Sequence, residues 1–223
     1  MRTQGLAKWV WISGTGVLAA FAVVVGFWLA RGTVTFATTK VITVPSGSML
    51  PTLKVGKSYR ARLDVFLKAI PKCGDIVVFF PPSEALYSGE GMSFWVSRCV
   101  GVPGDLIEIK EGVLWRNGTK IAEPYLKDPM DNPYDFKLIQ YKGQIIPLSI
   151  SFGLVNNDNH TASKYFIDDP ELMKQYLKCP PARIPPGFCI VMGDNRNGAF
   201  DSRAWGPVQL DRVVARIDDL TPL

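Results

Sequence analysis

The sequence predicts a mainly β fold, in which a single amino-terminal transmembrane helix precedes an antiparallel β-rich domain. Three observations favour this class. Residues 9–30 carry no charge, and as a helix they would span roughly 33 Å, enough for a bilayer core. The rest of the chain has short apolar runs of strand length. The 223 residues include 17 prolines and 20 glycines, which favour a body of short strands and turns.

The apolar segment 9–30 has the flanks of a retained membrane anchor. Trp9, Trp11 and Trp28 lie near its ends, where indole rings favour the membrane interface. A cleaved signal peptide is the alternative, but the apolar region of such a peptide usually has about 7–15 residues. This segment is longer, and no A-x-A cleavage motif follows it. We therefore expect one helix in the lipid bilayer.

Basic residues predict how this helix is oriented. Arg2 and Lys8 precede it and Arg31 alone directly follows it, and the more basic flank favours the cytoplasm. The protein would then be a single-pass protein of the plasma (inner) membrane. The expected organisation is a cytoplasmic tail at 1–8, a transmembrane helix at 9–30 and an extracytoplasmic β domain at 31–223, with an insertion at roughly 123–180.

Composition argues against two classes of function. The formal net charge is +5, and the basic residues are scattered, so a nucleic-acid partner is not expected. None of the four cysteines belongs to a C-x-x-C pair, and the only histidine is His160. A zinc site is therefore not expected.

The cysteines leave two alternatives open. An exported domain can hold disulfides, and Cys73 could pair with Cys99 across a hairpin. Cys179 and Cys189, which flank a proline-rich turn, would form the second pair. Four free thiols are the alternative.

Strands are expected wherever a short apolar run is bounded by turn residues. An extended segment at 32–45 comes first, and Asn117-Gly118 predicts a hairpin within 106–126. A short helix is expected at 170–177 inside the insertion. The remaining expected strands lie within 57–66, 73–80, 93–102, 185–195 and 211–217, and 81–91 has the composition of a loop.

The segment VPSGSMLPTL at 44–53 has the composition of a reactive turn. Ser46 and Ser48 flank Gly47, which permits a backbone bend, and prolines restrict both sides. A hydroxyl held on such a turn suits nucleophilic attack, and a second hydroxyl nearby could stabilise an oxyanion. Taken alone, the segment is more typical of an ordinary structural turn.

Three further segments follow it in order, namely GDIVVF at 74–79, SRCVGVPGD at 97–105 and GDNRNGAFDSRAWGPV at 193–208. Together with SGSMLPTL they resemble the consecutive motifs of type I signal peptidases, membrane serine proteases that remove leader sequences from exported proteins. GVLWRNGTKIAEPYL at 112–126 is similar to the hairpin that follows the third motif of this family. The resemblance extends from Val44 to Ile217 and implies a signal-peptidase-like β domain.

The resemblance implies roles for residues of the serine turn. Ser48 matches the nucleophile, and its N–H and the hydroxyl of Ser46 match the oxyanion hole. Val44 and Pro45 lie on a strand that would pair with the substrate, and Val96 lies across the cleft. Val44, Leu53 and Val96 would form shallow pockets for small side chains, in keeping with the family's preference for Ala-x-Ala.

The resemblance also implies structural support from Arg98 and from an Asp201–Arg203 pair, which a buried site would need because an unpaired buried charge is costly. It implies exported precursors with leader peptides as partners, and neither a metal nor a cofactor. The implied activity is that of a serine endopeptidase of the signal peptidase I type.

The sequence departs from the family at Ser97. The bacterial family has its general base here, a lysine whose pKa is lowered by burial, and serine cannot act as a base near neutral pH. The family commonly has a serine where Ala199 stands, hydrogen-bonded to that lysine. The loss of both partners of one contact favours natural divergence.

Three interpretations follow for the activity. The chain could be a peptidase whose base comes from elsewhere, the candidates being Lys40, Lys54, Lys57 and His160. It could be a catalytically lost partner that binds leader peptides in an export or pilus-assembly system. It could also be an engineered inactive form of a working peptidase. A membrane-anchored β domain with a scaffolding role is a fourth alternative, and it predicts no cleft beside Ser48.

Overall fold

The computed structural model describes residues 38–66, 69–85, 93–129, 135–149 and 170–223. Within them, Thr39–Leu223 forms one compact unit. The predicted tail and transmembrane helix lie outside the described residues. Within the described ranges, no helix is both long and apolar enough to cross a membrane.

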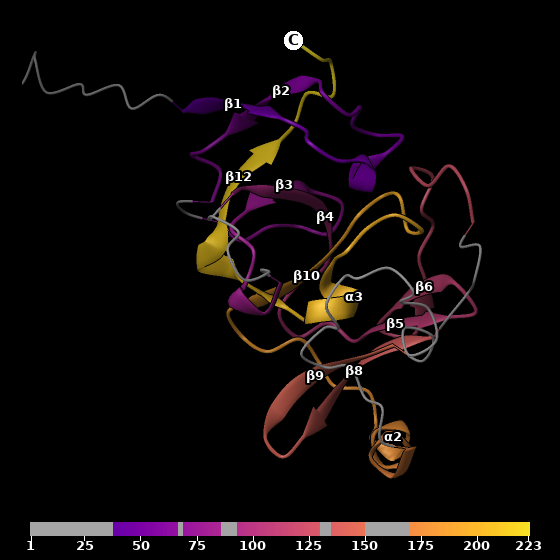
Figure 1. The fold of residues 1–223 in the computed structure, drawn as a ribbon. Coiled ribbons are helices and arrows are strands. Elements are labelled where there is room, and N and C mark those ends of the chain that lie inside the picture. Colours follow the sequence, from indigo (N-terminus) through magenta and orange to yellow (C-terminus); the bar gives the residue numbers. More distant parts are fainter. Residues whose placement is uncertain (1–37, 67–68, 86–92, 130–134, 150–169) are drawn as a thin grey trace, which may run out of the picture. The chain divides into compact units, whose positions relative to one another are not determined.

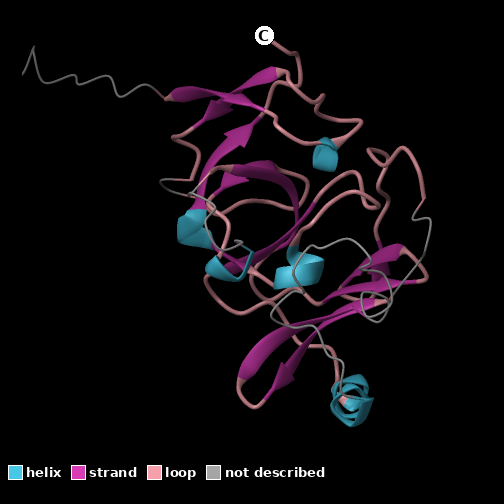
Figure 2. Ribbon diagram, viewed as in Figure 1, coloured by secondary structure: helices cyan, strands magenta, loops and turns pink. Residues whose placement is uncertain are grey.

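The described chain folds into two antiparallel sheets, and Figure 2 shows that its helices are short. The larger sheet has the strand order β1 (Thr39–Thr43), β2 (Ser58–Arg62), β12 (Val213–Ile217), β3 (Ile76–Phe79), β4 (Trp95–Gly101), β10 (Phe188–Met192) and β11 (Val208–Gln209) (Figure 1). The smaller sheet has the order β7 (Thr119–Lys120), β6 (Val113–Arg116), β5 (Ile107–Lys110), β8 (Phe136–Tyr141) and β9 (Gln144–Ser149). The helices are η1 (Gly47–Met49), η2 (Ser83–Ala85), α2 (Pro170–Lys178), α3 (Ser202–Trp205) and η3 (Leu210–Arg212). The mainly antiparallel β prediction is confirmed.

Two-residue turns connect neighbouring strands of the smaller sheet. Asn117-Gly118 joins β6 to β7 with φ values of 52° and 78°, and this confirms the predicted hairpin. Glu111-Gly112 and Lys142-Gly143 join β5 to β6 and β8 to β9 with the same left-handed backbone. Positive φ at both turn residues matches the twist of the flanking strands, so each pair forms a tight hairpin.

The insertion expected at 123–180 extends the smaller sheet. It contributes β8 and β9, which the sequence analysis did not predict, and α2, which confirms the helix expected at 170–177. The helix packs beside these strands through Leu172, Met173 and Tyr176 (Figure 1).

Three apolar clusters form the body of the domain. Alternate residues of β3 face opposite sides, so that Ile76 and Val78 pack in one cluster and Val77 and Phe79 in another. Both faces of this strand are therefore covered, which explains its uninterrupted apolar sequence. A third cluster joins β4 and β10 to β5, β6 and β8, and it fixes the smaller sheet against the larger one.

All four cysteines are free thiols, so neither of the two disulfides considered from the sequence is formed. Cys99 and Cys189 are buried, and Cys73 and Cys179 are half-buried. The neighbouring Cys99 thiol and burial raise the pKa of Cys73. A hydrogen bond with Cys189 and burial raise the pKa of Cys99. Thiols in such surroundings stay protonated and unreactive at neutral pH.

Candidate active site

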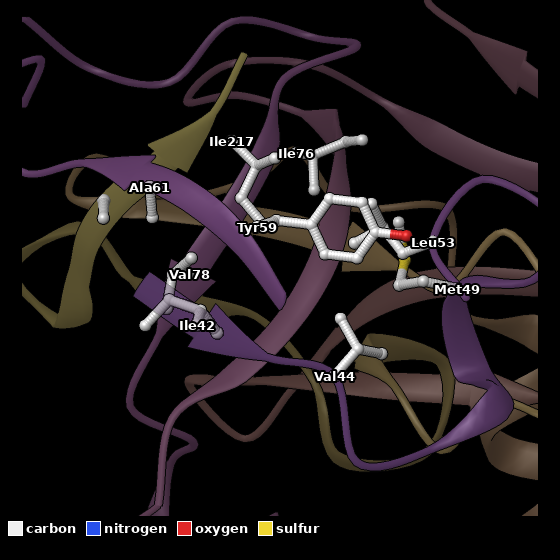
Figure 3. Close-up of a cluster of buried hydrophobic side chains, with 10 residues drawn as sticks. Ile42, Val44, Met49, Leu53, Tyr59, Ala61, Ile76, Val78 and Ile217 are labelled. Carbon is white, nitrogen blue, oxygen red and sulfur yellow. The ribbon is translucent and has the colours of Figure 1, made fainter. Parts of the chain in front are cut away.

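The serine turn is anchored by apolar side chains directly after it. Buried apolar side chains of β1, of η1 and of the strands around them pack together, and we call this group the serine-turn cluster. It consists of Ile42, Val44, Met49, Leu53, Tyr59, Ala61, Ile76, Val78, Ala215 and Ile217. Met49 and Leu53 are fully buried there, beside the ring of Tyr59 (Figure 3). The N–H of Lys54 donates to the Tyr59 hydroxyl at 2.9 Å. The polar turn therefore lies on a rigid apolar base.

Ser46 and Ser48 lie side by side on this turn. Their hydroxyl oxygens are 3.2 Å apart, and Ser48 is half-buried whereas Ser46 is exposed. Ser46 has an extended backbone at the N-cap of η1, and its side chain makes no capping hydrogen bond. A pair of hydroxyls this close can provide a nucleophile and a donor to the oxyanion that attack creates.

The loop after β10 holds the serine turn directly. The N–H of Asn195 donates to the carbonyl oxygen of Ser48 at 3.0 Å, and its Nδ2 donates to that of Gly47 at 3.1 Å. A Cβ on Gly193 would lie 2.5 Å from the Ser48 carbonyl oxygen and 2.5 Å from the Ala199 Cβ. Only glycine permits this approach, which brings Ala199 close to the nucleophile's backbone.

Arg98 and Asp194 form a buried ion pair behind the turn. Arg98 donates from Nε and Nη2 to the two carboxylate oxygens at 2.8 and 2.6 Å. The same carboxylate accepts a hydrogen bond from the hydroxyl of Thr52, which ties it to the serine segment. Burial alone would lower the pKa of Arg98, but the hydrogen bonds and charge of Asp194 raise it, so Arg98 stays charged. Sequence reasoning missed Thr52, Asp194 and Asn195, although the last two belong to the quoted GDNR segment.

Asp201 and Arg203 form a second buried ion pair. Arg203 donates from Nε and Nη2 to the carboxylate at 2.7 and 2.8 Å. One of the carboxylate oxygens also accepts the N–H of Gly193 at 2.9 Å, and Arg203 donates to the carbonyl oxygen of Ala199 at 3.2 Å. The pair thereby fixes Gly193, which lies against the Ser48 carbonyl, and Ala199 beside it.

Ser97 lies on β4, which adjoins η1. It is buried and pairs with Val77 of β3. Strand alternation places it on the face that carries Trp95 and Cys99, both of which belong to the Val77–Phe79 cluster. This face is apolar, so it would lower the pKa of an amine placed there.

The base candidates do not join this group within the described part of the chain. Lys40, Lys54 and Lys57 are exposed, and the Lys40 ammonium lies 4.3 Å from the centre of the Phe94 ring. His160 lies outside the described residues. No group of three or more His, Cys, Asp or Glu side chains that could hold a metal occurs in the described ranges.

Two strand edges adjoin the serine turn. β1 is the terminal strand of its sheet and leads into η1. β10 pairs with β4 only along Arg98–Gly101, so that among the described residues no strand covers the corresponding edge at Trp95–Ser97. Such edges can bind an extended peptide through backbone hydrogen bonds.

The residues assigned to substrate pockets lie around these edges. Val44 and Leu53 are buried in the serine-turn cluster, and Val96 packs against it while half-buried. Pro45 is exposed. Of these four residues, Pro45 and Val96 therefore offer the surface that a peptide bound at the β1 edge would meet first.

Comparison with known proteins shows that most of the chain matches one protein family. Residues 13–219 match the family model described as "Signal peptidase, peptidase S26". Signal peptidase I of Bacillus caldolyticus is 31% identical over 176 residues, which cover 78% of this chain and 75% of that protein. Signal peptidase IB of Staphylococcus aureus is 29% identical over 175 residues, which cover 78% of this chain and 73% of that protein.

Other relatives are longer than this chain. Thylakoidal processing peptidase 1 of Arabidopsis thaliana is 26% identical over 177 residues, which cover 78% of this chain but 39% of that protein. A relative from Synechocystis sp. is 28% identical over 173 residues, and the match covers 65% of its length.

Proposed function

Since the chain belongs to the signal peptidase family, peptidase S26, we propose that it is a serine endopeptidase that removes leader peptides from exported precursors. The observation that carries this proposal is the pair of hydroxyls of Ser46 and Ser48, 3.2 Å apart on a turn that Asn195 holds by two hydrogen bonds. A scaffolding domain would not need two paired hydroxyls beside uncovered strand edges.

In the proposed reaction, the precursor binds as an extended strand along β1, with its small side chains against Val44, Leu53 and Val96. Ser48 Oγ attacks the scissile carbonyl carbon and loses its proton to a base. The oxyanion accepts hydrogen bonds from the Ser48 N–H and the Ser46 hydroxyl. The C–N bond breaks, the leaving amine takes up a proton, and water hydrolyses the ester on Ser48.

The proposed setting is the outer face of the plasma membrane. Residues 9–30 would anchor the chain in the lipid bilayer, with the tail 1–8 in the cytoplasm and the β domain outside. The domain would then meet precursors where they leave the bilayer.

A second candidate function is leader-peptide binding without cleavage, in an export or pilus-assembly system. Ser97 and Ala199 favour it, because neither can accept a proton from Ser48 at neutral pH. The exposure of Lys40, Lys54 and Lys57 favours it further, since a lysine base needs burial to lower its pKa.

Cleavage of a precursor with an Ala-x-Ala leader separates these candidates. The full chain, Ser48→Ala, His160→Ala, Ser97→Lys and Ser97→Lys/Ala199→Ser would be compared. Cleavage that Ser48→Ala abolishes supports a peptidase with another base, and loss in His160→Ala would identify that base. Cleavage only after lysine is introduced supports a site without its base. If no form cleaves and none binds the leader, the proposed function is wrong.

A further inference from the structure

The segment Glu123–Tyr125 makes contacts that the proposed reaction leaves unexplained. It follows β7 of the smaller sheet, yet its side chains reach the loop after β10. The Arg98 guanidinium carbon lies 3.9 Å from the centre of the Tyr125 ring. The Tyr125 hydroxyl donates to Glu123 Oε1 at 2.6 Å. Stacking and hydrogen bonding thereby link the two side chains to a residue of β4.

Glu123 pairs in turn with Arg196. Arg196 donates from Nη1 and Nη2 to the two oxygens of the Glu123 carboxylate at 3.0 and 2.5 Å, and its Nε donates to the carbonyl oxygen of Gly193 at 3.0 Å. The Arg196 and Glu123 side chains are 1% and 7% exposed. Bidentate pairs of this kind are the strongest of the charge-assisted hydrogen bonds, and they fix orientation as well as distance.

These contacts close a ring. It runs from Asp194 through Arg98, Tyr125 and Glu123 to Arg196, and the backbone joins Arg196 to Asp194 through Asn195. Asn195 therefore lies between Asp194 and Arg196, the two residues at which the side-chain contacts meet the backbone. It is also the residue whose N–H and side chain hold Ser48 and Gly47.

We propose that Glu123 and Tyr125 are positioning residues for Ser48, because their ring fixes the loop whose Asn195 holds the serine turn. This inference rests on the proposed role of Ser48. Tyr125 acts through Arg98, which binds Asp194, and Glu123 acts through Arg196. Burial and the hydrogen bond to Glu123 raise the pKa of Tyr125, so its hydroxyl keeps the proton that it donates.

Hydrogen exchange in the full chain tests this without requiring activity. The amides of Asn195 and Leu50 report the turn, since they donate to Ser48 and Gly47. The amide of Val44, which donates to Lys57, is an internal reference outside the ring. In Tyr125→Phe we expect the first two amides to exchange about 5-fold faster and Val44 to be unchanged, in line with the loss of one hydrogen bond.

Glu123→Gln should increase the exchange rates of the same amides further, because it leaves Arg196 buried without a carboxylate partner. Tyr125→Phe retains the aromatic side chain against Arg98 and tests the proposal even if Glu123→Gln does not fold. Glu171→Gln, a matched change at an exposed pair on α2, should alter none of the three amides. If Tyr125→Phe and Glu171→Gln leave Asn195 and Leu50 equally protected, Glu123 and Tyr125 do not position Ser48.

A kinetic readout separates this inference from the proposed function. In whichever form cleaves the precursor, Tyr125→Phe should lower kcat about 3-fold or more and leave KM unchanged, because peptide binding uses other residues. An equal change in kcat and KM, or none in kcat, overturns the positioning role. If no form cleaves, the proposed peptidase activity fails, and the exchange rates still decide whether the ring holds the turn.

Discussion

The two halves of the candidate site differ sharply. On the nucleophile side, Ser48 is held by Asn195 from one direction and by the buried Met49 and Leu53 from the other. On the base side, Ser97 and Ala199 offer only small side chains. Among the described residues, the support for the proposed nucleophile Ser48 is therefore extensive, whereas Ser97 and Ala199 supply no base for it.

We infer from this difference that the serine turn is supported independently of the side chain at position 97. The ion pairs Arg98–Asp194 and Asp201–Arg203 fix the loop around Gly193, and neither involves Ser97. The base could consequently be exchanged or lost without disturbing the serine turn. Four measurements test this separation, given in decreasing order of the change expected.

The largest effect is expected from Asp194→Asn. The change leaves Arg98 buried beside a neutral group, and breaking a buried ion pair costs about 3–5 kcal/mol. Chemical denaturation would measure this as a fall in the free energy of unfolding. Arg62→Leu, which breaks a pair with Asp218 at 47% and 36% side-chain exposure, is the control and should cost about 0–1 kcal/mol. Equal losses in both would contradict the supporting role of Asp194.

Gly193→Ala should disturb the serine turn and the neighbouring Ala199. The new Cβ would meet the Ser48 carbonyl oxygen at 2.5 Å, and this kind of overpacking costs about 1–3 kcal/mol. Denaturation and the exchange rate of the Asn195 amide would both report it. Adding Ala199→Gly removes only the side-chain clash, so we expect the double variant to recover little. Full recovery would show that Ala199, and not the Ser48 backbone, limits the space.

Ser97→Lys should act on the base side alone. An amine on this buried, apolar face of β4 lacks a partner, which costs about 1–3 kcal/mol in the free energy of unfolding at neutral pH. Ala199→Ser in the same chain should restore about 1 kcal/mol if its hydroxyl reaches the amine. Thermal and chemical denaturation would measure both changes. An unchanged exchange rate of the Asn195 amide is expected, and a large change would mean that the halves are coupled.

The smallest effect concerns alkaline pH. The pKa of Tyr125 is raised in the folded state by burial and by Glu123, so the stability from its protonated form is complete below the unfolded pKa of about 10. It is lost as pH rises toward the higher folded pKa. Tyr125→Phe should therefore lose less stability than the parent between about pH 9 and 11, as measured by denaturation. Parallel losses would show that Tyr125 does not contribute to this dependence.

Much of the fold was predictable because local signals determined it. The apolar run of β3 and the Asn117-Gly118 turn each favour one local structure. β9 was missed because Pro147 lies within it and interrupts the pattern expected of a strand, and β8, its hairpin partner, was missed with it. Whether the cysteines form disulfides could not be predicted, because pairing depends on distances in space. All four lie at strand or turn positions compatible with it.

The contacts of the candidate site that could be predicted lie within short motifs, as for Ser46 with Ser48 and Asp201 with Arg203. Ser46 and Ser48 lie within one short segment, and the structure brings their hydroxyls together. The partner of Arg98 was not predictable, because Asp194 is 96 residues away and a second carboxylate, Asp201, lies in the same segment. The contact of Tyr125 with Arg98 crosses between the two sheets and leaves no periodic signal in the sequence.

The order of strands in the larger sheet has a consequence for synthesis. β12, at the carboxyl-terminal end of the described chain, lies between β2 and β3, and β10 covers β4. The smaller sheet, by contrast, is built mostly from neighbouring hairpins and can form while the chain is still emerging. Ser48 emerges early, but Asn195 and the loop that holds it emerge late. A nascent copy of this protein would therefore carry Ser48 before the loop that holds its turn has emerged.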